Sequence, residues 1–329
     1  MRNLTPTAFL APTSTAPKGT FLGDRLVNRY LLLEPLGKGS ASRVFLARDE
    51  RTNAHVAVKV LPPYGSSPFA TRERFDAEVA VGCGVAHANV ARILDAGTST
   101  WGEPFMVTEA LVGETLGDRL HDVKRLTASD ALSLVREAAR GLAAIHRAGY
   151  VHRDVKPDNL FLCDVPRHGV AVKVIDFGFC TQVARETTEE RKVLGTLEYM
   201  APEQAVAEAT DVRADVYSLG VVLFRSVTGE LPFDACENRG ILTHHLLSPV
   251  PPPSWLVDEL DARIDPIVLG TTRKHPDNRY PTMAALLADL ERAIDGLPVR
   301  GVPMRVEPDG YHPTTETGRL AFDTLSGEI

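Results

Sequence analysis

The sequence predicts an α+β protein in two parts, a small antiparallel β-sheet with one main helix followed by a larger, mainly helical part. From Tyr30 to Glu109, short runs of β-branched residues and leucine alternate with turn residues, a pattern typical of successive antiparallel strands. After Thr127 the apolar residues recur at helical spacing. A glycine-containing connector within residues 105–117 separates the two patterns, so we place the boundary between the parts there.

Four segments follow from these patterns. Residues 1–22 are rich in proline, threonine and alanine and have little to bury, which predicts a disordered N-terminal arm. Residues 23–109 should form the sheet-containing part and residues 110–296 the helical part. Residues 297–329 leave the helical pattern and carry threonines, prolines and acidic residues. We therefore expect a C-terminal tail that is flexible or regulatory.

The composition is typical of an ordinary globular protein. Of 329 residues, 44% are hydrophobic and 24% are charged, and the formal net charge is -7. This balance gives no overall attraction to nucleic acid or anionic membranes, so we predict no nucleic-acid partner. No apolar run approaches the roughly twenty residues that cross a bilayer, which predicts a cytoplasmic protein with no membrane span. The four cysteines lack Cys-x-x-Cys spacing and are expected to be reduced thiols.

The stretch His152–Asn159, with the sequence His-Arg-Asp-Val-Lys-Pro-Asp-Asn, predicts phosphoryl-transfer chemistry. Its spacing can bring a proton acceptor (Asp154), a cation (Lys156) and a neutral oxygen ligand (Asn159) around one small volume. Phosphoryl transfer needs such an arrangement, because its transition state requires positioning and charge neutralisation more than covalent help. The alternative for this stretch alone is a solvated charged loop.

A glycine-rich segment, Leu36–Val44, lies between two of the predicted strands. Gly37 and Gly39 let the backbone come close to a polyphosphate, so that its N–H groups can bond phosphate oxygens. The alternative is an ordinary tight hairpin. Ser42 stands where a G-x-G-x-x-G pattern has its third glycine, which makes the loop stiffer at its far end.

The predicted strand Val56–Val60 places Ala57 and Lys59 on the same face. An inward-facing lysine needs an anion nearby, because burying an unpaired charge is costly. Glu78 can supply that anion from a helix for which Thr71 is the expected N-cap. The pair would leave Lys59 able to contact phosphates. The alternative is that both charged residues lie on the surface.

Two further segments complete the predicted site. Where the last strand of the sheet runs into the connector, the backbone N–H and C=O groups of Glu109 and Leu111 can bind an adenine edge, and Met106 would limit the depth of that pocket. After a short buried strand, Asp176 is placed to bind a magnesium ion that bridges nucleotide phosphates, and Gly178 permits the sharp turn that follows.

With these motifs in order, residues 23–296 resemble a eukaryotic-like (Hanks-type) serine/threonine protein kinase of the kind found in bacteria. The resemblance also includes the segment Ala201-Pro202-Glu203. It implies a two-lobed protein kinase fold, ATP and Mg²⁺ as cofactors, and transfer of the γ-phosphate to Ser/Thr hydroxyls of protein substrates.

The resemblance assigns roles residue by residue. Catalytic roles fall to Asp154, Lys156, Lys59 and Glu78, and metal binding to Asn159 and Asp176. The implied ATP-binding residues are Leu36, Gly37, Lys38, Gly39, Ser40, Val44, Ala57, Lys59, Met106, Glu109, Leu111, Asn159, Phe161 and Asp176.

Other matches refine the resemblance. Lys156 and Thr196 agree with the Ser/Thr branch of the family rather than with the tyrosine branch. Asp215, at the start of an apolar helix, resembles the buried aspartate that braces the catalytic loop. Arg279 resembles the arginine that pairs with the glutamate of Ala-Pro-Glu, which is Glu203 here.

The loop between Gly178 and Gly195 is the predicted activation loop. Arg153 would attract a phosphorylated residue in it, which predicts activation by autophosphorylation at Thr187 or Thr188, with possible self-association for that step. The alternative is that these threonines are solvated loop hydroxyls.

An ATP-binding pseudokinase that signals by conformation is the alternative function. Such proteins usually lack one of the residues found here as Lys59, Asp154 and Asp176, and only the departures at Ser42 and Gly82 favour it. A kinase for small molecules fits less well, because the Ala-Pro-Glu segment shapes a peptide-docking surface.

Overall fold

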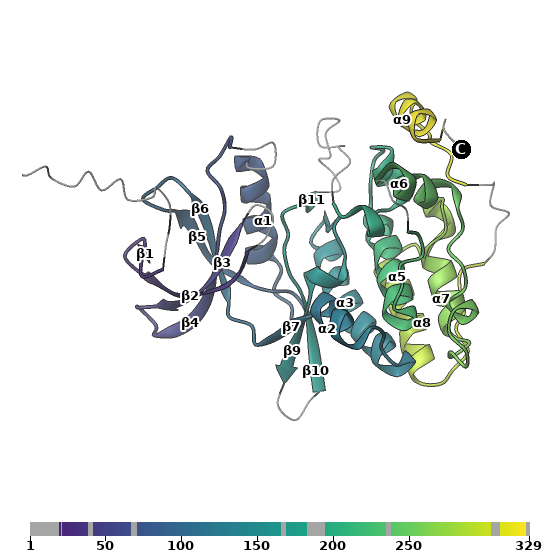
Figure 1. Cartoon of the computed structure of the whole chain (residues 1–329), viewed down its shortest axis with the longest axis horizontal. Coiled ribbons are helices and arrows are strands. Elements are labelled where there is room, and N and C mark those ends of the chain that lie inside the picture. Colours follow the sequence, from purple (N-terminus) through teal and green to yellow (C-terminus); the bar gives the residue numbers. More distant parts are fainter. Residues whose placement is uncertain are drawn as a thin grey trace, which may run out of the picture.

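The computed structural model describes residues 20, 22–38, 42–66, 71–165, 169–182, 195–234, 238–303 and 310–326. A twisted β-sheet with helix α1 forms one end of the molecule, here called the sheet lobe, and the other end is mainly helical, here called the helical lobe (Figure 1). This arrangement confirms the predicted α+β class and its two lobes. Gly39, Ser40, Thr187, Thr188 and most of the N-terminal arm lie outside the described residues.

Six antiparallel strands form the sheet lobe, in the order β1-β2-β3-β4-β6-β5. They are β1 Arg25–Leu26, β2 Tyr30–Lys38, β3 Arg43–Asp49, β4 Ala54–Val60, β5 Ile93–Thr98 and β6 Pro104–Glu109. The buried core of this lobe includes Val56, Val58 and Val60 of β4. Since side chains alternate along a strand, the predicted pair Ala57 and Lys59 lies on the other face.

Helix α1 (Arg72–Gly84) crosses the sheet lobe and carries Glu78 on its buried side. The Thr71 side chain accepts a hydrogen bond from the Arg74 N–H, so Thr71 is the predicted N-cap. A Cβ on Gly82 would come within 2.4 Å of the Ile93 side chain. The glycine at position 82 therefore allows α1 and β5 to approach closely, a reason that the helical pattern alone does not reveal.

The helical lobe begins with a small three-stranded sheet. Its strands are β7 Gly113–Thr115, β9 Leu160–Val165 and β10 Gly169–Val174, while β8 Tyr150–Val151 pairs with β11 Thr181–Gln182. The helices are α2 Leu116–Val123, α3 Ala128–Arg147, α4 Pro202–Ala205, α5 Val212–Thr228, α6 Asn238–Leu247, α7 Ile264–Thr271, α8 Met283–Ile294 and α9 Glu316–Ser326. Nearly every residue of α5 is buried, and α3, α7 and α8 contact it. This central position explains why its sequence is apolar on almost all sides.

Helix α3 runs into the stretch that the sequence singled out. The Thr127 side chain caps its first turn by accepting a hydrogen bond from the Asp130 N–H. The helix ends before Gly149, whose φ of +85° is easily adopted only by glycine. The connector in 105–117 holds more structure than expected, since β7 lies within it and Thr115 with Asp118 forms a capping box for α2.

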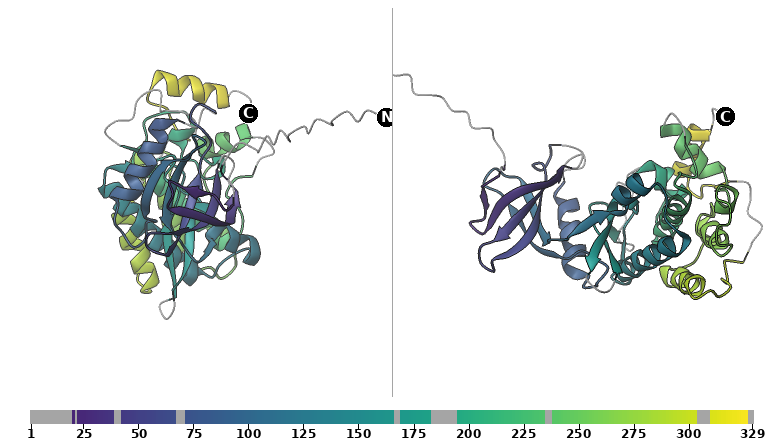
Figure 2. Two further views of the ribbon diagram at one scale, coloured as in Figure 1. Left: turned by 90° about the vertical axis from the view of Figure 1, so that its left-hand side faces the viewer. Right: turned by 60° about the horizontal axis from the view of Figure 1, so that its bottom comes forward.

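Part of the predicted C-terminal tail is a helix packed on the protein. Helix α9 lies against α6 at the far end of the helical lobe, as two views show (Figures 1 and 2). Its apolar face is short, because only Ala321, Phe322 and Leu325 join the core beneath it, which is why no helical pattern stands out in the sequence. Among the described residues, no helix is long and apolar enough to span a bilayer.

Candidate active site

Three charged side chains meet between the two lobes. Lys59 lies on β4, Glu78 on α1 and Asp176 two residues after the end of β10. Lys59 Nζ lies 2.8 Å from Glu78 Oε1 and 2.8 Å from Asp176 Oδ1. The alternative that Lys59 and Glu78 are unrelated surface charges is therefore excluded, and the pair predicted from the sequence exists.

Lys59 and Asp176 both stay charged near neutral pH. Burial disfavours the ammonium form of Lys59, but the carboxylates of Glu78 and Asp176 outweigh it and raise the pKa of Lys59 above its ordinary value. Burial opposes ionisation of Asp176 as well, yet Lys59 and the Gly178 N–H hold the pKa of Asp176 at about 2. For Glu78, burial is the largest effect and raises the pKa. The cleft thus presents an ammonium and a carboxylate at physiological pH.

The carboxylate of Asp154 is held from three sides. Asn159 Nδ2 donates to the Asp154 backbone oxygen at 2.7 Å and to Asp154 Oδ2 at 3.0 Å. The Thr196 N–H donates to Oδ1 at 2.9 Å, and Lys156 Nζ lies 2.9 Å from Oδ2. Lys156 also donates to the Thr196 hydroxyl at 2.6 Å. These contacts fix the orientation of the carboxylate that the sequence proposes as the proton acceptor.

Asp215 supports this loop from below. Its two carboxylate oxygens accept hydrogen bonds from the backbone N–H groups of His152 and Arg153, each at 2.8 Å. His146 Nε2 lies 2.7 Å from the same carboxylate. These bonds hold Arg153 at a φ of +67°, a left-handed conformation that is uncommon for a side-chain-bearing residue. Asp215 thus bonds the backbone of the loop that carries Asp154, and the bracing role that the resemblance implies stays a prediction.

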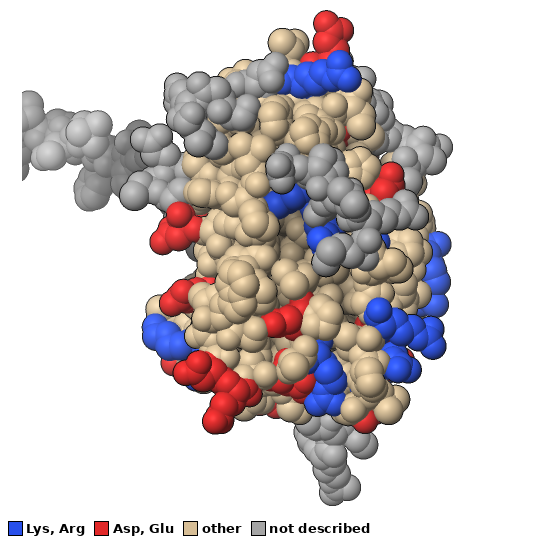
Figure 3. All heavy atoms as spheres, turned by 90° about the vertical axis from the view of Figure 1, so that its right-hand side faces the viewer, with Lys and Arg blue, Asp and Glu red and all other residues tan. Residues whose placement is uncertain are grey.

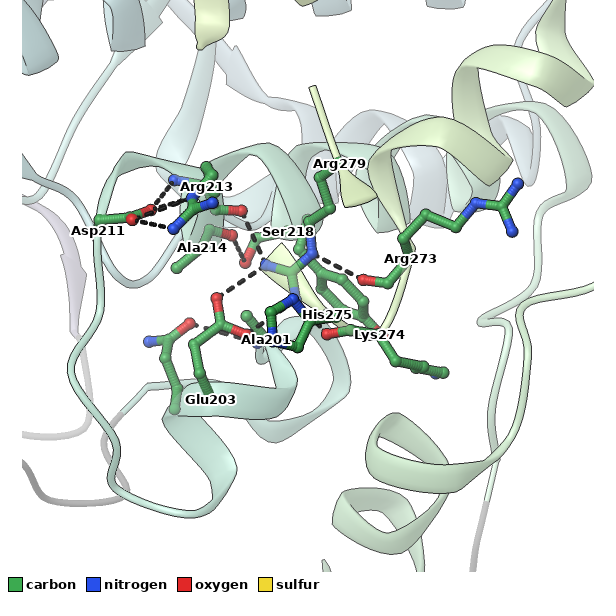
Figure 4. Close-up of polar contacts among 12 residues, drawn as sticks. Ala201, Glu203, Asp211, Arg213, Ala214, Ser218, Arg273, Lys274, His275 and Arg279 are labelled. Carbon is green, nitrogen blue, oxygen red and sulfur yellow. Dashed lines mark hydrogen bonds and ion pairs between the residues drawn. The ribbon is translucent and has the colours of Figure 1, made fainter. Parts of the chain in front are cut away.

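Arg279 and Glu203 form a fully buried pair (Figure 4). Two parallel bonds of 2.7 and 2.8 Å join the guanidinium to the carboxylate. The remaining guanidinium donors bond the backbone oxygens of Arg273, Lys274 and Arg213. Next to Glu203, the Gln204 side chain donates to the Arg153 backbone oxygen at 3.0 Å, which connects this anchor to the loop that carries Asp154.

A model of the protein kinase domain matches residues 30–285 of the sequence. This chain belongs to the protein kinase family. It is 37% identical over 281 residues to serine/threonine-protein kinase PknB of Mycobacterium tuberculosis (strain ATCC 25618 / H37Rv), a match that covers 84% of this chain and 44% of that protein. The predicted resemblance to bacterial Ser/Thr kinases is confirmed, and membership of the family implies use of ATP and a divalent metal ion.

Two other relatives agree with this assignment. Serine/threonine-protein kinase Pkn1 of Myxococcus xanthus is 35% identical over 317 residues, covering 91% of this chain and 45% of that protein. The probable serine/threonine-protein kinase CPE1738 of Clostridium perfringens (strain 13 / Type A) is 34% identical over 272 residues, covering 82% of this chain and 39% of that protein. The chain thus spans less than half of the length of these curated relatives.

The residues Asn159 and Asp176 fit a divalent metal ion, because each has a side-chain oxygen that takes no part in its hydrogen bonds to other described residues. Asn159 uses Nδ2 for both of its bonds to Asp154, so its amide oxygen is not consumed by them. Asp176 accepts from Lys59 and Gly178 through Oδ1, which leaves Oδ2 out of those bonds. Among the described residues, no group of three or more His, Cys, Asp or Glu could hold a metal by itself. Few protein oxygens suit Mg²⁺, which takes further ligands from phosphates and water.

The register of β4 and β6 sets which residues lie beside those predicted to bind adenine. Ala57 lies opposite Thr108, and Lys59 lies opposite Met106. Met106 is buried in the main core cluster, whereas Thr108 is partly exposed beside Ala57. Thr108 is thus a cleft residue that the sequence reasoning missed, although its place two residues after Met106 puts it on the same strand face. The Glu109 N–H bonds the Arg92 oxygen at 3.2 Å, so Glu109 can offer adenine only its carbonyl.

The described part of the chain also contains Val44, Leu36 and Phe161 of the predicted ATP-binding set. Val44 lies opposite Lys59 in the β3–β4 pairing and opposite Gly37 in the β2–β3 pairing. Leu36 is exposed at 53%, as a residue at the rim of a cleft would be. Phe161 is partly buried on β9, opposite Thr115 of β7.

Arg74 is a second residue near the site that the sequence reasoning missed. It lies four residues before Glu78 on α1, and its guanidinium carbon is 5.3 Å from the centre of the Phe179 ring. Burial, and then the nearby charge of Arg153, lower the pKa of Arg74. Two arginines from different lobes therefore lie close together beside the start of the predicted activation loop. Helical spacing from Glu78 is the signal that could have found Arg74.

Proposed function

We propose that this chain is a serine/threonine protein kinase that transfers the γ-phosphate of ATP to hydroxyl groups of protein substrates, with Mg²⁺ as the metal. The carrying observation is the geometry around Asp154, which is fixed by Asn159, Lys156 and the Thr196 N–H. A substrate hydroxyl that attacks the phosphate needs a correctly oriented carboxylate to accept its proton. The phosphoryl group being transferred needs a cation beside it to offset its negative charge.

In this mechanism each of the site residues has a separate role in phosphate transfer. Asp154 Oδ1 bonds the Thr196 N–H and keeps a second lone pair, which can accept the proton of a substrate hydroxyl. Lys156 bonds Asp154 and lies beside the site of transfer, where its ammonium group can offset phosphate charge. Lys59, positioned by Glu78, would bond the non-transferred phosphates. When bound between Asn159 and Asp176, Mg²⁺ supplies charge neutralisation on the phosphates.

Activation by autophosphorylation at Thr187 or Thr188 remains part of this proposal. Arg153 and Arg74 support it, because two neighbouring cations would attract a phosphorylated threonine. Self-association would then serve the transfer of phosphate between copies. The cytoplasmic location stays a prediction from composition, and the pseudokinase alternative gains no support from the geometry of Lys59, Asp154 and Asp176.

Transfer of labelled phosphate tests the activity. The full chain is incubated with labelled ATP, Mg²⁺ and a generic protein substrate, and the rate is compared with those of Asp154→Asn and Asp164→Asn. Asp164 lies exposed on β9, so its substitution controls for loss of one carboxylate. We expect Asp154→Asn to be slower by roughly 10³-fold and Asp164→Asn to match the wild type. Equal labelling by wild type and Asp154→Asn would remove Asp154 from its assigned role.

A further inference from the structure

The last described segment, residues 310–326, is bound to the surface of the helical lobe, and we name it the C-terminal latch. It enters through Gly310, which has a φ of +82° and whose added Cβ would lie 2.9 Å from Leu247 Cδ2. The Tyr311 N–H donates to the Leu246 backbone oxygen at 2.7 Å. The Tyr311 ring is buried and stacks on His275. This entry fixes the latch at the C-terminal end of α6.

Glu208, which follows α4, is the polar anchor of the latch. It is only 4% exposed, and its carboxylate accepts from Tyr311 Oη at 2.5 Å. The backbone N–H groups of Thr314 and Thr315 donate to Oε1 at 2.6 and 2.7 Å, and Thr314 Oγ1 lies 3.1 Å from the same oxygen. Burial raises the pKa of Glu208, but these hydrogen bonds outweigh it and lower the pKa overall. Glu208 is therefore ionised and serves as the anion at the N-terminus of α9.

Helix α9 adds an apolar contact to this polar anchor. A Cβ on Gly318 would lie 2.6 Å from Glu208 Oε1, so only glycine allows the first turn to approach so closely. Ala321, Phe322 and Leu325 pack into a cluster formed by α4, α6 and the segment before α4. Thr243 Oγ1 of α6 donates to the Leu325 oxygen at 3.0 Å. The latch is thus held at both of its ends.

The surface beneath the latch continues to the catalytic loop. Leu197 and Met200 belong to the same cluster as the latch residues. Leu197 directly follows Thr196, whose N–H bonds Asp154 and whose hydroxyl bonds Lys156. In the face that Figure 3 shows, charged side chains gather in the lower half and at the top edge, and much of the visible surface between them is uncharged. Release of the latch would therefore expose an apolar face next to the residues that orient Asp154.

We propose that Thr314 is a phosphorylation site and that a phosphate on it releases the C-terminal latch. This inference rests on the proposed kinase function only for the source of the phosphate. Thr314 is an exposed residue whose Oγ1 lies 3.1 Å from Glu208 Oε1, so an enzyme can reach the hydroxyl when this one contact opens. Thr315 differs, because it is less exposed and its Oγ1 accepts from the Gly318 N–H at 3.0 Å as the cap of α9.

A phosphate on Thr314 opposes docking for two reasons. It carries a charge of about -1.5 to -2 and would lie beside the buried carboxylate of Glu208, where repulsion is poorly screened. It also competes for the same N–H groups at the start of α9 that Glu208 uses, because a phosphate binds well at a helix N-terminus. Two anions cannot share this one position, so the latch leaves its anchor.

The transfer step uses ATP bound to a second copy of this chain. A bond forms between Thr314 Oγ1 and the γ-phosphorus, and the bond from that phosphorus to the oxygen bridging to the β-phosphate breaks. ADP leaves with the bridging oxygen. The hydroxyl proton of Thr314 passes to the Asp154 carboxylate of the copy that catalyses the step.

Phosphopeptide mapping tests the modification. The full chain is incubated with Mg²⁺ and ATP, and phosphate is mapped in wild type and in Asp154→Asn. We expect phosphate on Thr314 in the wild type and none in Asp154→Asn. Phosphate on other residues with Thr314 unmodified would overturn this inference while leaving the kinase function intact. No phosphate on any residue would overturn the proposed function and the modification together.

Cleavage by trypsin tests release of the latch, independently of kinase activity. Arg319 is the only Lys or Arg in residues 310–329, so cleavage after it reports opening of α9. Thr314→Glu is compared with Thr317→Glu, which adds the same charge at an exposed residue in the first turn of α9, three residues further along the chain. We expect cleavage after Arg319 to be roughly tenfold faster in Thr314→Glu and nearly unchanged in Thr317→Glu.

The double variant Glu208→Gln with Thr314→Glu identifies the cause of release. If repulsion between two anions opens the latch, Thr314→Glu should accelerate cleavage far less in the Glu208→Gln background than in the wild type. The same acceleration in both backgrounds would show that Glu208 is not the opposing charge. Equal cleavage of Thr314→Glu and Thr317→Glu would overturn the release mechanism itself.

Discussion

The cleft around Lys59 and the Glu203–Arg279 anchor each pair a basic side chain with carboxylates, but they differ in how far the charged groups are buried and hydrogen-bonded inside the protein. In the anchor, the Arg279 side chain is 0% exposed and the Glu203 side chain 3%, and five hydrogen bonds from the guanidinium are made within the protein. In the cleft, the Lys59 side chain is 19% exposed and the Asp176 side chain 41%.

This difference separates structural charges from reactive ones. A buried pair whose hydrogen bonds are all made inside the protein has nothing left to offer a ligand, so its loss should affect folding. A partly exposed carboxylate with an oxygen outside its internal bonds can bind a metal or a phosphate, so its loss should affect chemistry. The two regions therefore predict opposite patterns of activity and stability when one carboxylate of each is replaced.

The largest expected effect is on the activity of Asp176→Asn. The substitution removes the proposed metal ligand and one of the two carboxylates beside Lys59, so kcat should fall by roughly 10³-fold. Lys59 keeps Glu78 as its partner, and the free energy of unfolding should change by less than about 1 kcal/mol. Phosphate transfer and urea unfolding measure the two quantities. A large loss of stability would place Asp176 with the anchor rather than with the cleft.

Glu203→Gln should show the reverse pattern in stability. It leaves the Arg279 charge buried without its carboxylate, and the free energy of unfolding should fall by about 3 to 5 kcal/mol. Glu291→Gln is the matched control, because the Arg140–Glu291 pair is 40% and 50% exposed and should contribute less than about 1 kcal/mol. Urea unfolding of the three proteins compares them. Similar losses in Glu203→Gln and Glu291→Gln would contradict the distinction between buried and exposed pairs.

The charged residues of the cleft were easier to predict from the sequence than the residues around it. Lys59, Asp154 and Asp176 could be found because each stands in a short motif whose chemistry demands that residue type. Thr108 and Arg74 were missed because threonine and arginine at those positions are ordinary until strand register and helix placement bring them to the cleft. The docking of α9 was also missed, since it depends on Glu208, more than a hundred residues away in the sequence.

A buried histidine, His245, extends the comparison between buried and exposed charges. Both of its ring nitrogens can make their hydrogen bonds only while the ring is uncharged. His245 lies between Tyr217 Oη, 2.8 Å from Nδ1, and the Glu198 backbone oxygen, 3.1 Å from Nε2. A neutral ring that donates through Nε2 and accepts at Nδ1 satisfies both partners. Burial, followed by the nearby Lys274 charge, lowers the pKa of His245 to about 3. His245 therefore connects α6 to the segment around Thr196 in its neutral form.

The pH dependence of stability follows from that pKa. Between the ordinary histidine pKa of about 6.5 and the folded value of about 3, the unfolded chain binds a proton that the folded protein does not, so stability falls as the pH is lowered. From pH 7 to pH 5, urea unfolding should show a loss of about 2 kcal/mol that depends on His245. His245→Gln should lack this loss, while His244→Gln, at an exposed position next to it, should keep it. An identical pH dependence in His245→Gln and wild type would show that His245 accepts a proton inside the fold.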